Sequence, residues 1–302
     1  ILSTVRYYGL AVRNVAIELT ESSVNSLTEL SEFSRTIRRS GFLLSLDNFG
    51  TEHSSLERVA TLRPDLIKID RSIIYGVSES SRKRSVLRAV AYLARTIGAL
   101  SLAQGLERYE DLQVCAYEGI DFAQGFLLSR PGPDLDTVLR RKYSKADPHF
   151  DVLEQDLREY LRSRSDAYRR IQDRVDAVAA DLRTYPRADM TTALEKAIPD
   201  ISVFDAAYVL DESGAQITRT VMTRERRRRE RHPLFHPAEE GTVHRLKDYA
   251  YGPSALDRDR FFTAPYLSLN SGEVCRTISR RFASSDGYEL VLCIDIPEET
   301  EG

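Results

Sequence analysis

The chain has 302 residues, with 43 lysines and arginines against 46 aspartates and glutamates, so its formal net charge is −3. This length predicts two domains. The near-neutral charge argues against a dedicated nucleic-acid-binding protein, which would normally carry a basic excess. With 42% hydrophobic and 29% charged residues, the composition also excludes disorder over most of the length.

Three cysteines, at positions 115, 275 and 293, are spaced too widely for a disulfide framework or a zinc site. Their spacing favours a protein of the reducing cytoplasm. No apolar run reaches the roughly 18 residues that a membrane-spanning helix needs, and no signal peptide is visible. The sequence opens at Ile1 inside a helical pattern, from which we expect an incomplete N-terminus.

Short leucine-rich or β-branched runs alternate with amphipathic stretches through residues 1–131. The runs predict strands at 15–19, 42–46, 66–69, 99–103 and 122–123. The stretches predict helices at 24–40, 54–62, 81–97 and 109–118. Regular alternation of this kind predicts βαβ units and a parallel sheet.

Charged or amide side chains stand at the end of each predicted strand. Polar residues at the carboxyl end of every strand favour a (β/α)8 barrel over a doubly wound sheet, whose site lies at a single switch point. Five strands are counted where a closed barrel has eight. We therefore expect a partial TIM-like barrel, with about three strands upstream of residue 1.

Residues 146–184 carry apolar side chains mostly at three- and four-residue steps, which predicts one long amphipathic helix or two in sequence, ended by Pro186. Such a helix either packs on a neighbouring domain or acts in signalling or dimerisation. Beyond it, a helix is predicted at 191–197 and strands at 206–210, 216–220, 265–269, 274–280, 281–283 and 288–296. Consecutive hairpins predict an antiparallel sheet in an α+β module.

Five carboxylates are expected to converge where the parallel strands of the first domain end: Glu18, Glu21, Asp47, Asp70 and Glu107. Such crowding is unfavourable unless protons or cations neutralise it, and a hard ion such as Mg²⁺ suits carboxylate oxygens. Lys68, on a strand that reads as buried, adds a cation able to bind a phosphate oxygen or orient a water. Together these groups indicate phosphoester chemistry, and surface salt bridges are the alternative for single residues.

Six sequence blocks in one order carry a family resemblance: Ile17–Ser22, Leu46–Thr51, Ser54–Leu56, Leu66–Ser72, Ala103–Glu107 and Gln124–Pro131. In this order and spacing they resemble the EAL domain of cyclic-di-GMP phosphodiesterases over roughly residues 1–131. The resemblance implies two Mg²⁺ or Mn²⁺ ions that activate a water. The water attacks one phosphodiester of cyclic-di-GMP and gives linear pGpG.

The resemblance also implies a role for each matching residue. Glu18 corresponds to a ligand of the first metal, Asp47 bridges the two metals, and Lys68 orients the water. The implied metal positions are Glu18, Asp47 and Asn48, the catalytic positions are Lys68, Gln104 and Glu107, the loop anchor is Glu21, and the ligand-binding positions are Asp70 and Gln124.

Asn48 and Gln104 depart from the family, which has acidic residues at both second-metal positions. An amide oxygen coordinates more weakly and cannot accept the proton, and loss of a positioned base costs about 10²–10⁴ in rate. We therefore expect an impaired second metal site and a weak or inactive domain that binds cyclic-di-GMP or transmits a signal. An active phosphodiesterase and a dimeric interaction scaffold are the alternatives.

The predicted domains are the EAL domain at 1–133, a helical linker at 134–186 and a sensor domain at 187–302. The last of these resembles PAS-like or Cache-like domains through 260–266, 271–273 and 292–296, and such domains dimerise or bind a small ligand. Tyr266 and Asp295 are either pocket residues or structural sheet positions.

The expected partners are cyclic-di-GMP and a second copy of the chain, with no nucleic acid and no membrane segment. One basic run stands apart from this reading, because Arg224–Arg231 contains six arginines and two glutamates. It is either a phosphate-binding segment or a solvated loop.

Overall fold

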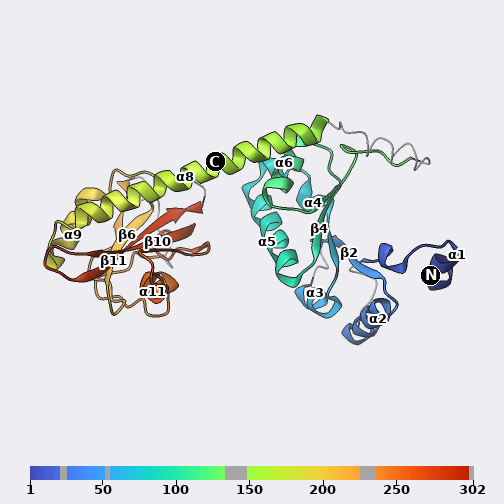
Figure 1. Cartoon of the computed structure of the whole chain (residues 1–302), viewed down its shortest axis with the longest axis horizontal. Coiled ribbons are helices and arrows are strands. Elements are labelled where there is room, and N and C mark those ends of the chain that lie inside the picture. The colour runs from blue at the N-terminus through green and yellow to red at the C-terminus, as the bar shows by residue number, and fades with distance from the viewer. Residues whose placement is uncertain (21–25, 52–54, 133–147, 225–234, 299–302) are drawn as a thin grey trace. The chain divides into compact units, whose positions relative to one another are not determined.

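The computed structural model describes residues 1–20, 26–51, 55–132, 148–224 and 235–298 (Figure 1). The chain divides into two compact units, Ile1–Leu161 and Arg162–Gly302. Each unit has its own sheet and its own hydrophobic core. The three-segment division at residues 133 and 186 stays a prediction.

Unit 1 is built on a parallel five-stranded sheet whose strands lie in chain order, β1-β2-β3-β4-β5. The strands are β1 Ala16–Thr20, β2 Leu43–Phe49, β3 Leu66–Ile69, β4 Leu100–Gln104 and β5 Phe122–Gln124. All five were predicted from their apolar runs, and the α/β class with a parallel sheet is confirmed. The barrel closure that we expected stays a prediction.

Helices follow the strands of unit 1, with α5 beside β4 (Figure 1). They are α1 Leu2–Tyr7, α2 Leu27–Arg39, α3 Leu56–Leu62, α4 Arg71–Ile74, α5 Ser81–Ile97 and α6 Tyr109–Tyr117, with 3-10 turns η1 Val12–Asn14 and η2 Val77–Glu79. Ser26 and Ser80 cap α2 and α5 by accepting hydrogen bonds from the backbone. Gly98 ends α5 in the left-handed conformation expected of its position.

The two faces of the parallel sheet differ in character because side chains alternate along each strand. One face is buried against the helices and carries residues of the core: Leu19, Leu44, Leu46, Ile67, Ile69 and Ala103. The strand register places Glu18, Asp47, Lys68 and Gln104 on the opposite face. This face also carries Leu43, Leu100 and Phe122, which are about half exposed.

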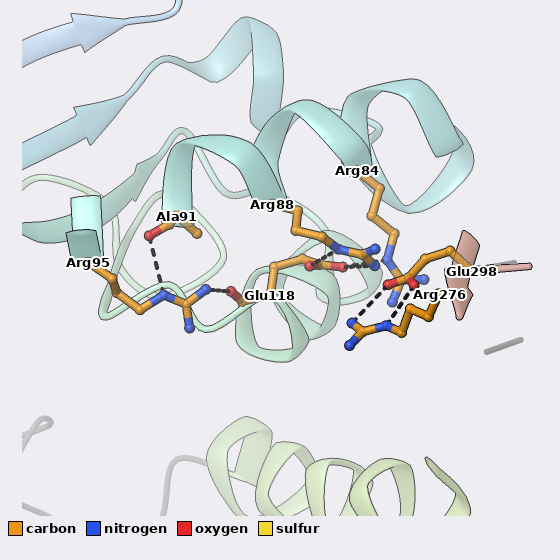
Figure 2. Close-up of polar contacts among 7 residues, drawn as sticks. All are labelled: Arg84, Arg88, Ala91, Arg95, Glu118, Arg276 and Glu298. Atoms are coloured by element: carbon orange, nitrogen blue, oxygen red, sulfur yellow. Dashed lines mark hydrogen bonds and ion pairs between the residues drawn. The ribbon is translucent and has the colours of Figure 1, made fainter. Parts of the chain in front are cut away.

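A buried carboxylate joins α5 to the end of α6 (Figure 2). The side chain of Glu118 is 5% exposed and accepts hydrogen bonds from Nε of Arg84 at 2.7 Å and from Nε of Arg88 at 2.8 Å. Arg95 donates to the carbonyl oxygen of Glu118 at 3.2 Å. Burial raises the pKa of Glu118, but the hydrogen bonds from Arg88 and Arg84 outweigh it and hold the pKa below its ordinary value.

The long helix predicted at 146–184 is a single helix, α8 Pro148–Leu182. In unit 1, Asp156 of α8 accepts hydrogen bonds from Tyr109 and Gln113 of α6, at 2.8 Å and 2.5 Å. Tyr160 of α8 stacks on Tyr117, with ring centroids 4.1 Å apart. The last turns of α8 contribute buried apolar side chains, including Leu182, to the core of unit 2. Each end of α8 therefore packs within its own unit, and a role in signalling or dimerisation stays a prediction.

Unit 2 contains an antiparallel sheet with strand order β7-β6-β11-β10-β8, and β9 pairs with β10. The strands are β6 Ala206–Asp211, β7 Val221–Met222, β8 Arg260–Phe262, β9 Tyr266–Leu267, β10 Val274–Ala283 and β11 Glu289–Pro297. The helices of this unit, besides the last turns of α8, are η3 Arg187–Asp189, α9 Met190–Ala197 and α11 Asp248–Ala255. An ion pair between Arg276 of β10 and Glu298, 3.0 Å long, also lies in this unit (Figure 2).

Several predictions for unit 2 were wrong in detail. Residues 216–220 were expected to form a strand, but only Gln216 makes an isolated bridge. The Gln216 amide instead donates to the carbonyl oxygens of Thr218 and Ala238, so side-chain bonds replace a strand ladder. The strands predicted at 274–280 and 281–283 are one strand, β10.

Helix α11 and strand β8 were not predicted. Helix α11 contains Gly252 and Pro253, which both disfavour a helix interior. In the structure the ring of Phe261 fills the space beside Gly252 that a side chain would occupy. Tertiary packing therefore overrides the local propensity here.

None of the helices in the described ranges is both long and apolar enough to span a membrane. The three cysteines are free and buried. Of the predicted basic run, only Arg224 lies in the described ranges, where it pairs with Asp200 at 3.0 Å.

Replacing Glu118 with Gln tests the buried ion cluster. The variant removes the charge that both arginines contact, so we expect the free energy of unfolding to fall by about 1–3 kcal/mol at pH 7. Because the folded-state pKa of Glu118 is lowered, the difference from wild type is full above about pH 5 and shrinks as the pH falls through that pKa. Urea unfolding at several pH values measures it.

Glu110→Gln is the matched control, because Glu110 lies on α6, the helix that Glu118 follows, is 61% exposed and sits 3.7 Å from Arg108. It should change the free energy of unfolding by less than about 0.5 kcal/mol. Equal effects of the two variants, or a Glu118→Gln effect that grows on acidification, would contradict the account.

Candidate functional site

Four strands bring predicted site residues together on the exposed face of the unit 1 sheet. Glu18 comes from β1, Asp47 from β2, Lys68 from β3 and Gln104 from β4. They meet because neighbouring parallel strands are hydrogen-bonded in a register that sets their carboxyl ends side by side.

Lys68 is the centre of this group. Its ammonium Nζ lies 2.9 Å from Oε1 of Glu18 and 3.1 Å from Oδ1 of Asp47. Gln104 donates from Nε2 to the same Oδ1 of Asp47, at 3.0 Å. The side chains of Lys68 and Asp47 are 10% and 17% exposed, whereas that of Glu18 is 51% exposed. The group therefore opens to solvent on the Glu18 side.

The charge of Lys68 is stabilised by its carboxylate neighbours. Burial lowers the pKa of Lys68, but the hydrogen bonds with Glu18 and Asp47 outweigh burial and raise the pKa above its ordinary value. Lys68 is therefore an ammonium at neutral pH. Two carboxylates against one ammonium leave a formal charge of −1, which attracts a further cation.

Asn48 sits in an irregular part of β2. Its φ of 57° is left-handed, and the pairing with β3 shifts register between Leu46 and Phe49. Asparagine and aspartate tolerate this conformation better than most residues do. The bulge therefore places a half-buried Asn48 directly after Asp47 at the carboxyl end of the strand.

Gln104 supplies the clearest sign of an absent partner at this site. Its Oε1 is buried and has no hydrogen-bond partner, while its Nε2 donates to Asp47. A buried acceptor without a donor is unfavourable, and hard divalent cations prefer carboxylate and amide oxygens. A divalent cation at these strand ends would have the carboxylates of Glu18 and Asp47 and the buried Oε1 of Gln104 as oxygen ligands.

The described residues offer a weaker set of ligands for a second cation. Within the described ranges, no three His, Cys, Asp or Glu side chains cluster as a metal would require. Among the described residues, a metal at these strand ends would have the two carboxylates of Glu18 and Asp47, supplemented by amide oxygens. Each amide that replaces a carboxylate removes one negative charge from the ligand set.

Glu107 forms a separate ion pair with Arg71, a residue that no sequence pattern singled out. The Arg71 Nη2 lies 3.1 Å from Oε1 of Glu107. The guanidinium carbon lies 5.2 Å from the centroid of the Tyr75 ring. No local pattern predicted this pair, because its partners follow β3 and β4 and meet only in the fold.

The other predicted site residues are Asp70, Gln124 and Glu21, and their functions stay predictions. Asp70 caps α4 by accepting a hydrogen bond from the Ser72 backbone at 2.8 Å. Gln124 is exposed at the end of β5, and its carbonyl oxygen accepts from the Leu106 backbone at 3.1 Å. Glu21 lies outside the described residues.

In unit 2, Asp295 is fully buried within a hydrogen-bonded network. It accepts from Thr277 at 2.8 Å, Asn270 at 2.9 Å, and Tyr266 and Ser268 at 3.3 Å. Burial raises the pKa of Asp295 above its ordinary value. These contacts match the second reading of Tyr266 and Asp295, as structural sheet positions.

Comparison with known proteins supports the EAL domain family for residues 1–131, which the EAL domain family model matches. An uncharacterized protein of Azorhizobium caulinodans is 36% identical over 131 residues, covering 43% of this chain and 18% of that protein. The cyclic di-GMP phosphodiesterase PdeF of Escherichia coli is 31% identical over 134 residues, again 43% of this chain and 18% of that protein. The chain thus spans less than a fifth of the length of these two relatives.

A third relative extends over both units. The uncharacterized EAL-domain containing protein YkuI of Bacillus subtilis is 26% identical over 301 residues, covering 96% of this chain and 70% of that protein. A crystal structure of YkuI in complex with cyclic-di-GMP and calcium matches with a TM-score of 0.72 and 24% identity. The match covers 98% of this chain and 73% of the YkuI chain, which supports the fold of both units.

Restoring carboxylates at the two amide positions tests the metal assignment. Asn48→Asp with Gln104→Glu adds two negative oxygen ligands, and the left-handed backbone at Asn48 tolerates Asp. We expect affinity for Mn²⁺ to rise at least about tenfold, measured by calorimetry on the 302-residue chain.

The matched control is Asn14→Asp with Gln155→Glu, which makes the same chemical changes at exposed positions outside the carboxyl ends of the strands. It should leave Mn²⁺ affinity within about twofold of wild type, since exposed charges are screened. No gain from the site variant, or an equal gain from the control, would refute the assignment of these two residues to the metal site.

Proposed function

We propose that this chain is a cyclic-di-GMP signalling protein whose EAL domain binds the dinucleotide with a divalent cation and hydrolyses it weakly or not at all. The observation that carries this proposal is the Lys68 group, in which Glu18 and Asp47 are retained beside the amide of Gln104. The similarity to the cyclic di-GMP phosphodiesterase PdeF supports the choice of ligand.

The retained groups suit binding of a phosphodiester. Glu18 and Asp47 would hold one Mg²⁺ or Mn²⁺, with the unpartnered Oε1 of Gln104 as a further oxygen ligand. Lys68 would then face a phosphate oxygen or orient a water. Asp70 and Gln124, at the ends of β3 and β5, are proposed to contact the dinucleotide, and Glu21 to anchor the loop after Asp47.

The amides argue against efficient hydrolysis. Gln104 cannot accept a proton, so the base expected at its position is missing. With Asn48 also neutral, a second cation has a weaker ligand set, and the clamp that two metals place on the attacking and leaving oxygens is impaired. Glu107, the remaining predicted catalytic carboxylate, is paired with Arg71.

The role of unit 2 is a separate part of the proposal. We infer a sensor or dimerisation role for it from its antiparallel sheet with flanking helices and from its position after α8. The PAS-like or Cache-like identity, the homodimer and the cytoplasmic location stay predictions.

Calorimetry with cyclic-di-GMP and Ca²⁺, together with chromatography of cyclic-di-GMP incubated with Mn²⁺, tests the proposed function. We expect saturable binding and turnover at least about 10²-fold below the rate of an EAL enzyme with both acidic residues, because a positioned base contributes about that much or more. Replacing Asp47 with Asn should abolish the cation dependence of binding.

Two outcomes contradict the proposal in different ways. Formation of pGpG at the rate of that reference enzyme would establish the active phosphodiesterase that we kept as the alternative. Complete absence of dinucleotide binding would leave only the interaction scaffold.

A further inference from the structure

Arg71 is held in place on three sides beside the strand ends that form the candidate site. Its guanidinium pairs with Glu107 at 3.1 Å and lies over the ring of Tyr75 at 5.2 Å. Its aliphatic stem crosses Gly105, where an added Cβ would come within 2.7–2.9 Å of three stem atoms. Gly105 also has a φ of +72°, so its missing side chain both permits the turn and makes room for Arg71.

The arginine remains accessible despite these contacts. Its side chain is 56% exposed, and a guanidinium has five N–H donors in a planar fork. Lys68, by contrast, is 10% exposed and already contacts two carboxylates. Arg71 is therefore the better placed of these two cations to meet an anion arriving from solvent.

Electrostatics at the strand ends call for such a cation. Glu18, Asp47, Asp70 and Glu107 carry four negative charges against the two positive charges of Lys68 and Arg71. A cyclic dinucleotide brings two phosphate charges into this negative environment. An arginine whose geometry is preset by stacking and by Gly105 loses little conformational freedom when it binds a phosphate.

We propose that Arg71 binds a phosphate of the cyclic dinucleotide, exchanging the carboxylate of Glu107 for it. This rests on the proposed function, since the ligand is the same. In the free protein Glu107 holds the guanidinium in position. When the dinucleotide binds, its phosphate accepts two parallel hydrogen bonds from the guanidinium of Arg71. The carboxylate of Glu107 is then released from its ion pair with Arg71.

Calorimetric titration of the 302-residue chain with cyclic-di-GMP in the presence of Ca²⁺ tests this role. Arg71→Ala should raise Kd about ten- to a hundredfold, the range for losing a hydrogen bond to a charged group. Arg71→Lys keeps the charge but loses the planar fork, so its Kd should fall between those of Arg71→Ala and wild type. The loss should shrink at high ionic strength, because salt screens partly exposed charges.

Two controls separate a phosphate contact from a structural role. Arg82→Ala removes the same charge from an exposed position on α5 and should leave Kd within about twofold of wild type. In the Glu107→Gln background, where the resting ion pair is gone, Arg71→Ala should still weaken binding about tenfold or more. Melting temperatures of all the variants should lie close to that of wild type, since the Arg71–Glu107 pair is substantially exposed.

The outcomes separate failure of the Arg71 inference from failure of the proposed function. If wild type binds and Arg71→Ala binds equally well, or if its effect disappears in the Glu107→Gln background, the inference about Arg71 is wrong while the proposed function stands. If wild type does not bind cyclic-di-GMP, the proposed function fails and the inference fails with it.

Discussion

The candidate site depends on the ammonium of Lys68, which lies between the carboxylates of Glu18 and Asp47 at 2.9 Å and 3.1 Å. Three neighbouring strands contribute these groups, so the parallel register determines whether they meet. The lysine balances only part of the carboxylate charge. It therefore leaves the strand ends negative and suited to an additional cation, while its own charge is secured by its neighbours.

The amide of Gln104 is the basis for proposing weak or absent hydrolysis at this site. Its Nε2 donates a hydrogen bond to Oδ1 of Asp47, and its buried Oε1 has no hydrogen-bond partner. A glutamate there would repel Asp47 unless a metal or a proton lay between them. The amide instead donates a hydrogen bond to Asp47 when no metal is bound. In exchange, the site lacks a base and one negatively charged ligand. Under the proposed function, this exchange would favour recognition of a dinucleotide over its cleavage.

Much of unit 1 could be predicted from the sequence because its signals are local. Strands such as 66–69 are short apolar runs, and the polar residues that follow them necessarily gather at one edge of a parallel sheet. The Arg71–Glu107 pair could not be predicted in this way. It depends on the left-handed backbone of Gly105 and on the path of a long side chain across it, neither of which has a sequence period.

Unit 2 was harder to predict for a related reason. Helix α11 contains a glycine and a proline, and the packing of Phe261 beside Gly252 compensates for them only in the fold. Residues 216–220 have a strand-like composition, yet the Gln216 side chain bonds to Ala238 and to His244, both distant in sequence. Interactions between distant residues decide these segments, whereas the apolar run of β6 and the hairpin of β10 and β11 were local enough for the antiparallel sheet to be anticipated.

Counting the cations bound per chain tests the central claim most directly. Electron paramagnetic resonance of Mn²⁺, titrated into the chain saturated with cyclic-di-GMP, separates bound from free ions. The account predicts one tightly bound Mn²⁺ per chain, held by Glu18, Asp47 and the oxygen of Gln104. Two Mn²⁺ ions bound with similar affinity would contradict it, because the two negative charges missing at Asn48 and Gln104 would then not weaken the binding of a second ion.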